Sequence, residues 1–173
     1  DLGDALADQR SVLVDPRLTG MIVGLTLHTG RADIFRALIE ATAFASRKTL
    51  ERVWEHGIKT DEVVCCGGIA EKNPLFMQIY ADVLKLKMVV SAEPQSCALG
   101  SAMFGAATAG PERSGFDSLR SMQDKLCRRK GRIFQPDPAA AAVYDELYGL
   151  YCELHDGFGV SGSHADHYGL MKR

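Results

Sequence analysis

Hydrophobic residues along this chain of 173 residues follow two different patterns. Between residues 32 and 54 they are spaced three, four or five apart, which is typical of a long amphipathic helix. Gly57 follows that stretch and can adopt the left-handed conformation that often ends a helix. Residues 21–27, 62–66 and 87–91 are instead short apolar runs, which predict three strands. The run at 62–66 lacks alternation, so we expect both of its faces to be covered.

Further helices are predicted between and after these strands. Helical spacing marks residues 75–84, and a helix of small residues, 96–109, ends at Gly110. Residues 116–130 are interpreted as a helix with a basic end. The last predicted helix, 139–159, carries an aliphatic stripe: Val143, Leu147, Leu150 and Leu154. This order predicts an α/β fold in which a short mixed or parallel sheet is flanked by helices.

The size of the predicted sheet and the first residue both bear on whether the sequence is complete. Sheets usually have about 4–6 strands, so a three-stranded sheet is thin. The sequence also begins with Asp1 rather than methionine. We therefore expect it to be part of a longer chain.

Composition narrows the possible partners. Hydrophobic residues make up 46% of the chain, charged residues 24%, and the net charge is −2, so nothing in the balance demands a nucleic-acid or membrane partner. The five cysteines include no CxxC pair, and the adjacent Cys65 and Cys66 lie in an apolar run and read as buried thiols. This usage argues against a disulfide framework or a zinc site and favours the cytoplasm.

The stretch "VVCCGGIAEKNPLF" raises the main chemical question, because a strand stops at two glycines before a helix begins. Gly67 and Gly68 lack a Cβ, so a ligand can approach their backbone closely. Asn73 is a good N-cap and Pro74 suits the first helical position, so the helix would present N–H groups to an anion. A phosphate site and an ordinary tight turn both fit these residues.

Other reactive side chains are expected to be structural. Four carboxylates are interpreted as structural or solvated: Asp15, Asp61, Asp82 and Asp137. Of these, Asp82 is expected on the polar face of a helix. His155 and Asp156 are adjacent in a helix, so we expect them not to face each other. The basic run at 128–132 is read as a solvated helix end, and His28, His164 and His167 as loop or tail residues.

Several segments resemble a known family. "GMIVGLTLHT", "IFRALIEATAFASR", "DEVVCCGGIAEKNPLFMQIYADVL" and "CALGSAMFGAATAG" are similar, in this order, to the C-terminal portion of the FGGY carbohydrate kinases. The stretch "FQPDPAAAAVYDELYGLYCELHDGFG" is most similar to the ribulokinase branch of that family, whose members phosphorylate ribulose.

The resemblance implies an actin-like (ribonuclease-H-like) ATPase domain that uses ATP and Mg²⁺ and acts on a pentulose in arabinose catabolism. It implies that Gly67 and Gly68 lie along the nucleotide phosphates and that Asn73 approaches the nucleoside. It also implies that the catalytic base and most sugar contacts lie upstream, so we assign no catalytic residue and no metal ligand here, and we expect this chain alone to be inactive.

The domain organisation implied by the resemblance has three parts. Residues 1–30 form an irregular lead-in and strand, 31–134 the core of the ATP-side domain, and 135–173 its C-terminal helix and tail. A homodimer is a further possibility. The alternative reading is a non-catalytic α/β interaction or dimerisation module.

Overall fold

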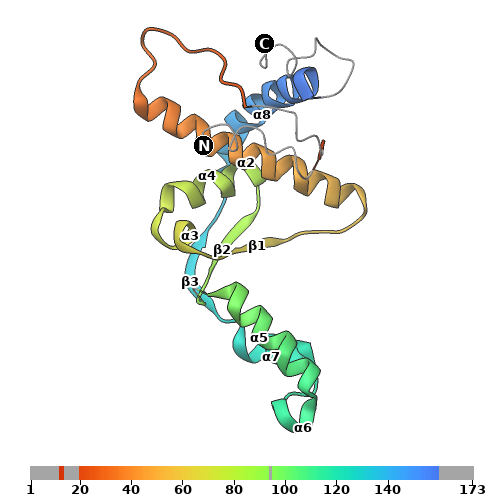
Figure 1. Cartoon of the computed structure of the whole chain (residues 1–173). Coiled ribbons are helices and arrows are strands. Elements are labelled where there is room, and N and C mark those ends of the chain that lie inside the picture. Colours follow the sequence, from red (N-terminus) through yellow and green to blue (C-terminus); the bar gives the residue numbers. More distant parts are fainter. Residues whose placement is uncertain (1–11, 14–19, 94, 160–173) are drawn as a thin grey trace, which may run out of the picture. The chain divides into compact units, whose positions relative to one another are not determined.

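A computed structural model describes residues 12–13, 20–93 and 95–159 of the chain (Figure 1). Its helices and strands, in chain order, are α2 (Arg31–Glu55), β1 (Glu62–Cys65), α3 (Gly68–Lys72), α4 (Pro74–Leu84), β2 (Lys87–Ser91), α5 (Ser96–Ala109), α6 (Pro111–Ser114), α7 (Leu119–Leu126), β3 (Arg129–Phe134) and α8 (Pro138–Gly159).

The described residues divide into two compact units. We call residues 61–78 and 86–135 the sheet unit, and residues 20–60, 79–85 and 136–159 the helical unit. The division into residues 1–30, 31–134 and 135–173 inferred from the sequence stays a prediction.

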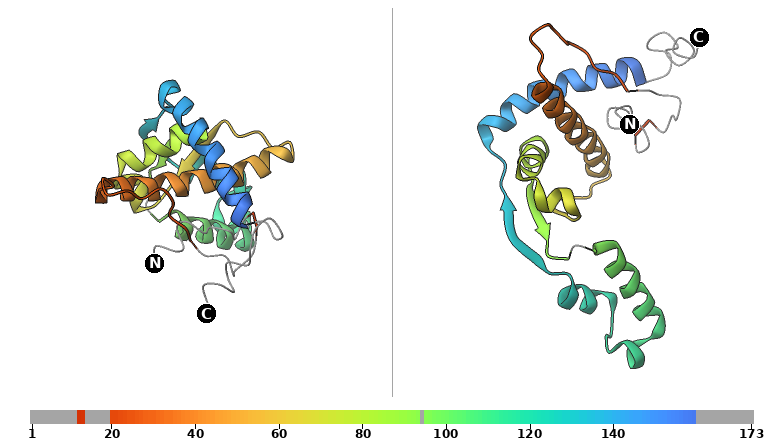
Figure 2. Two further views of the ribbon diagram at one scale, coloured as in Figure 1. Left: turned by 90° about the horizontal axis from the view of Figure 1, so that it is seen from above. Right: turned by 60° about the vertical axis from the view of Figure 1, so that its left-hand side comes forward.

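The sheet unit contains a mixed three-stranded sheet in the order β1-β2-β3. β1 and β2 are parallel, with Cys65 opposite Val90, and β2 and β3 are antiparallel, with Val89 opposite Ile133. The central strand forms the core, since Val89 and Val90 are each only 2% exposed. Helices α5, α6 and α7 follow β2, and α5 contacts both α6 and α7 (Figure 2). The predicted α/β class with a short mixed sheet is therefore confirmed.

The helical unit is built on the contact between α2 and α8 (Figure 1). Phe44 of α2 lies against Tyr144 and Tyr148 of α8, with ring centroids 6.1 and 5.9 Å apart. All three rings are buried, and such aromatic pairs add to the burial of apolar surface. α2 ends where the sequence predicted, because Gly57 has a φ of 79° just after it.

Two predicted elements are wrong in this structure. Residues 21–27 form no strand: they are irregular, Gly24 has a φ of 87°, and no described segment pairs with them. Residues 116–130 are not one helix, because α7 ends at Leu126 and β3 begins at Arg129. The basic run is thus largely strand, and pairing with β2 decides this, which local helix propensity cannot reveal.

The expected burial also needs correction. Val64 of β1 is 48% exposed, so this strand is not covered on both faces. Cys66 is exposed and Cys65 half-buried, so they are not a buried pair. The aliphatic stripe of α8 is exposed as well, because the tyrosine face of that helix packs against α2 instead.

Candidate functional site

The turn after β1 begins with a backbone conformation that favours glycine. Gly67 has a φ of 91° and a ψ of 171°, a region that L side chains rarely adopt. Its carbonyl accepts the first hydrogen bond of α3, from the Glu71 N–H at 3.2 Å. The five-residue helix α3 follows this turn. Gly67 therefore turns the chain from strand to helix within one residue.

Gly68 opens this helix and has space in front of it. An ideal Cβ built on Gly67 or on Gly68 meets no atom within 4 Å. The N–H groups of Gly68, Ile69 and Ala70 precede the first hydrogen bond of α3, so they have no acceptor within the helix. This combination forms an open backbone cradle, which can accept an anion close to the chain.

Asn73 ends α3 and caps α4. Its Oδ1 accepts a hydrogen bond from the Phe76 N–H at 3.0 Å, and its carbonyl accepts from Met77 at 3.3 Å. The predicted N-cap, followed by Pro74, is therefore confirmed. The cap occupies one of the N–H groups that the sequence reading had offered to an anion. The amide nitrogen of Asn73 remains able to donate to a ligand.

Neighbouring side chains shape the electrostatics of the turn. The Arg132 guanidinium of β3 donates to the Glu71 carbonyl at 3.1 Å, which places a cation at the end of α3. Burial, and then the nearby Cys66, raises the pKa of the Cys65 thiol. Sequence reasoning missed both α3 and Arg132, because the contact depends on a strand that was read as a helix.

Two of the carboxylates singled out from the sequence, Asp82 and Asp137, have structural roles. Asp82 is buried, not on a polar face, and its Oδ1 accepts the Asp137 N–H at 2.8 Å. Asp137 in turn caps α8 through the Ala139 N–H at 2.9 Å. Asp61 lies immediately before β1. Asp15, His164 and His167 lie outside the described residues.

The prediction that His155 and Asp156 do not face each other is wrong. Their side chains are joined by a 2.8 Å contact between Nδ1 and Oδ1. This bond, with the Lys48 ammonium, holds the pKa of Asp156 below its ordinary value. The His155 ring is also tilted against Tyr151, at 5.8 Å between centroids, so packing holds it in place.

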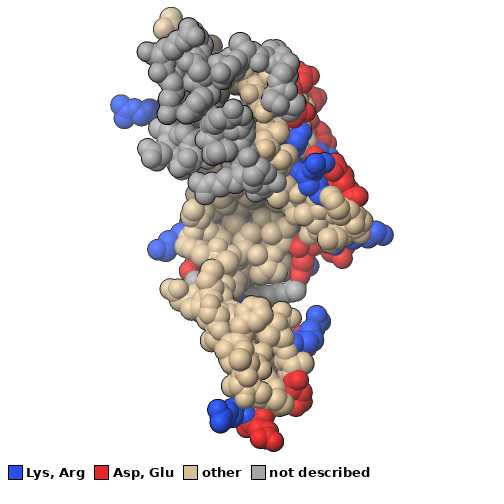
Figure 3. Space-filling view, turned by 45° about the vertical axis from the view of Figure 1, so that its right-hand side comes forward, with Lys and Arg blue, Asp and Glu red and all other residues tan. Residues whose placement is uncertain are grey.

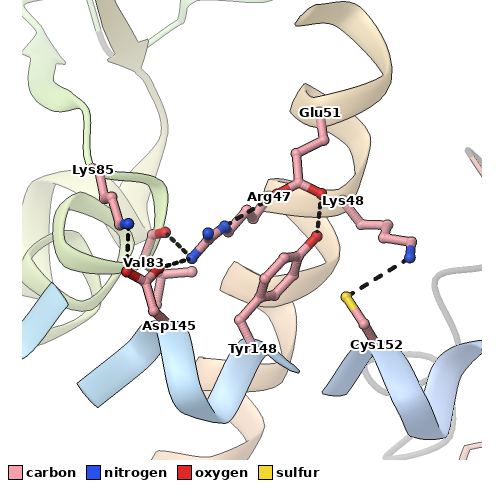
Figure 4. A network of polar contacts seen from close by, with 8 residues as sticks. All are labelled: Arg47, Lys48, Glu51, Val83, Lys85, Asp145, Tyr148 and Cys152. Atoms are coloured by element: carbon pink, nitrogen blue, oxygen red, sulfur yellow. Dashed lines mark hydrogen bonds and ion pairs between the residues drawn. The ribbon is translucent and has the colours of Figure 1, made fainter. Parts of the chain in front are cut away.

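A polar network joins the helices of the helical unit (Figure 4). Arg47 of α2 donates to Asp145 of α8 at 2.8 Å and to the carbonyl of Val83, at the end of α4, at 3.3 Å. The Arg47 guanidinium also lies 4.1 Å from the centre of the Tyr148 ring. Hydrogen bonds from Lys85 and then from Arg47 lower the pKa of Asp145. This network links α2, α8 and the end of α4 within the helical unit.

Comparison with known proteins places the chain in a family. Residues 3–109 match the model of the FGGY family of carbohydrate kinases, C-terminal domain. The chain belongs to the FGGY family of carbohydrate kinases. This confirms the resemblance noted in the sequence.

Relatives in the FGGY family include several ribulokinases. The ribulokinase of Geobacillus thermodenitrificans is 45% identical over 150 residues, which are 87% of this chain and 27% of that protein. The ribulokinase of Bacillus licheniformis is 44% identical over 164 residues, which are 95% of this chain and 29% of that protein. The chain thus spans less than a third of the length of these relatives.

Solved structures of FGGY kinases share the fold. A xylulose kinase from Lactobacillus acidophilus matches with a TM-score of 0.77 and 25% identity, over 94% of this chain and 30% of that one. A glycerol kinase from Plasmodium falciparum, solved with ADP, matches with a TM-score of 0.62 and 29% identity. The match covers 84% of this chain and 29% of that one. The expected actin-like kinase fold is therefore confirmed.

A phosphate and a cluster-bound metal ion would need different surroundings from the described residues. The open cradle at Gly67 and Gly68 is space that a Cβ would fill. In contrast, the described part of the chain contains no group of three or more His, Cys, Asp or Glu side chains that could hold a metal ion.

Neither the hydrophobicity of the helices nor the distribution of surface charge points to a particular class of binding partner. None of the helices described here is long and apolar enough to cross a membrane. On the face shown in Figure 3, acidic and basic side chains lie near one another and uncharged side chains cover a broad area.

Proposed function

We propose that this chain is the nucleotide-binding, C-terminal part of a sugar kinase that transfers the γ-phosphate of ATP to a hydroxyl group of ribulose. The observation that carries the proposal is the 45% identity to a ribulokinase across 87% of the chain. Five free thiols fit the reducing cytoplasm, where we place the enzyme.

The turn at Gly67 and Gly68 is the proposed contact with the phosphates of ATP. Support comes from the N–H groups that open α3, which have no acceptor within the helix, and from the space in front of both glycines. Negatively charged oxygens are stabilised by such convergent N–H groups. We propose that Asn73 donates its amide N–H to the nucleoside, since its Oδ1 is already bonded to Phe76.

Phosphoryl transfer depends on positioning and on neutralising charge, with little covalent chemistry for the protein to perform. In this proposal the chain binds and orients the nucleotide, and the catalytic base and the sugar contacts belong to the rest of the enzyme. Mg²⁺, when bound with ATP, would neutralise phosphate charge.

The test is to express the complete reading frame that encodes this chain and to measure ATP-dependent phosphorylation of ribulose in a coupled assay. Xylulose, glycerol and gluconate serve as competing substrates, because kinases for them share the fold. We expect ribulose to give the highest kcat/KM. A higher kcat/KM for another sugar would overturn the substrate assignment, and no turnover of any of them would overturn the kinase assignment.

The role of Asn73 is tested in the same enzyme with two variants. Asn73→Asp keeps an oxygen that can cap α4 but loses the amide N–H, whereas Asn73→Ala loses both. We expect Asn73→Asp to raise the KM for ATP several-fold at nearly unchanged stability. An unchanged KM for ATP in Asn73→Asp would remove Asn73 from the nucleotide site.

A further inference from the structure

A lysine of α2 and a cysteine of α8 meet within the helical unit (Figure 4). The Lys48 Nζ lies 3.7 Å from the Cys152 Sγ, within hydrogen-bond distance of the sulfur. The same nitrogen lies 3.3 Å from the Oδ1 of Asp156, one turn further along α8. The Lys48 side chain is only 20% exposed and Cys152 is half-buried, so the amine and the thiol share a partly enclosed space.

The surrounding contacts hold these two side chains close together. The buried Tyr148 precedes Cys152 by one turn of α8, and its hydroxyl donates to Glu51 of α2 at 2.6 Å. On the other side, a 2.8 Å contact with His155 holds the Asp156 carboxylate that pairs with Lys48. Interactions between α2 and α8 thus lie on both sides of the Lys48 and Cys152 pair, which keeps the nitrogen and the sulfur near each other.

We propose that Lys48 and Cys152 form an oxidation site, at which molecular oxygen links the two side chains through one bridging oxygen atom, Nζ–O–Sγ. Bridging requires the nitrogen and the sulfur to approach by about 1 Å, which the flexible four-carbon stem of lysine allows. All five cysteines are free, and the other four belong to the sheet unit. The group within hydrogen-bond distance of the Cys152 thiol is therefore an amine rather than a second thiol.

The reaction consumes one molecule of oxygen. The Lys48 ammonium first releases a proton to water, and the neutral amine and the Cys152 thiol then lose one hydrogen each. One oxygen atom forms the N–O and O–S bonds, and the other leaves as water with these two hydrogens. Nitrogen and sulfur are each oxidised by two electrons, and O₂ is reduced by four. Two equivalents of a dithiol reverse the reaction and release the bridging oxygen as water, so the link is a reversible form of cysteine oxidation.

The test is peptide mass spectrometry of the enzyme from the complete reading frame, after exposure to air-saturated buffer and again after dithiothreitol. We expect air to join the peptides that carry Lys48 and Cys152 at about 14 Da above their summed mass, for one oxygen gained and two hydrogens lost. Dithiothreitol should separate them. Lys48→Arg keeps the cation but removes the amine, and Cys152→Ser removes the sulfur, so each should abolish the link. Lys85→Arg is the matched control, because Lys85 pairs with Asp145 of α8 instead of a cysteine.

Thermal melting gives a second measurement. A link between α2 and α8 restricts the unfolded chain as a disulfide does, so oxidation should raise the Tm by about 5 °C in the wild type. The Tm of Lys48→Arg should not respond to air. An equal change in both proteins would overturn the stabilising effect of the link.

The other outcomes of the mass measurement count against the proposal. Separate peptides after air exposure, with Cys152 recovered as a thiol, a sulfenic acid or a sulfinic acid, would overturn it. So would joined peptides about 2 Da below their summed mass, because that mass corresponds to a direct N–S bond. A link that persists in Lys48→Arg would also overturn it. None of these measurements depends on phosphorylation of ribulose, so the proposal stands or falls separately from the proposed function.

Discussion

Replacing Arg47 with methionine should destabilise the fold far more than the same change at Arg52 of the same helix. The Arg47 side chain is 15% exposed and contacts Asp145, Glu51, the Val83 carbonyl and the Tyr148 ring. The Arg52 side chain is 62% exposed and pairs with Glu55 at 2.7 Å on the surface. Arg47 thus joins three helices, whereas Arg52 joins neighbouring turns of one.

The size of the effect follows from burial. Removing one partner of a fully buried ion pair costs about 3–5 kcal/mol, and exposed pairs contribute about 0–1 kcal/mol. Asp145 is 40% exposed and would still pair with Lys85 in the variant, so the cost should be smaller than for a fully buried pair. We therefore expect Arg47→Met to lower the free energy of unfolding by about 2–3 kcal/mol. For a chain of this length that is a fall in Tm of about 5–10 °C.

The assay is urea denaturation of the 173-residue chain, followed by far-UV circular dichroism, with thermal melting as a check. Arg52→Met should change the free energy of unfolding by less than about 0.5 kcal/mol. Equal effects of the two substitutions would refute the reasoning, because the network would then contribute no more than a surface pair.

Four further outcomes are expected. Gly67→Ala should lower the free energy of unfolding by about 1–3 kcal/mol, because its φ is positive, and an unchanged urea midpoint would contradict that conformation. Maleimide should label Cys66 faster than Cys65, whose pKa is raised by burial; peptide mass spectrometry after short exposure reports the order. The ion pairs of Asp145 lower its pKa. Their contribution to the free energy of unfolding should therefore be complete above about pH 5 and should be lost as the pH falls through the pKa of Asp145 in the folded state. Arg47→Met should weaken this acid dependence in urea titrations at several pH values. The purified chain alone should not phosphorylate ribulose, and steady ADP production that depends on ribulose would contradict this.

Apolar spacing, capping residues and glycines predicted the helices whose boundaries depend on neighbouring residues. The apolar spacing of residues 32–54 marked α2, and Asn73 with Pro74 marked the start of α4. Gly110 ends α5 as expected, with a φ of 82°. In each case, capping or backbone freedom within a few residues decides the boundary.

Elements that depend on distant partners could not be predicted in this way. The basic stretch of β3 is a strand only because β2 pairs with it. On α8 the buried face carries tyrosines rather than the aliphatic stripe. Tyr144 and Tyr148 can be buried because their hydroxyl groups donate to Glu40 and Glu51 of α2, at 2.9 and 2.6 Å. Those partners lie about a hundred residues away, beyond any local pattern.

The candidate site was predicted in part. The two glycines and the cap at Asn73 followed from their residue types, but helix α3 did not, since five residues carry too little periodic signal. The positive φ falls at Gly67, whereas no such strain is present at Gly68. A side chain at Gly68 therefore tests ligand approach with little disturbance of the fold.

The most direct test of the account is the KM for ATP of Gly68→Val in the enzyme from the complete reading frame. Gly149→Val is the matched control, because that glycine also has open space in front of it and no positive φ, but lies in α8. The account predicts at least a tenfold rise in the KM for ATP in Gly68→Val, with the KM for ribulose within twofold of wild type. An unchanged KM for ATP in a well-folded Gly68→Val enzyme would contradict the placement of the phosphates at this turn.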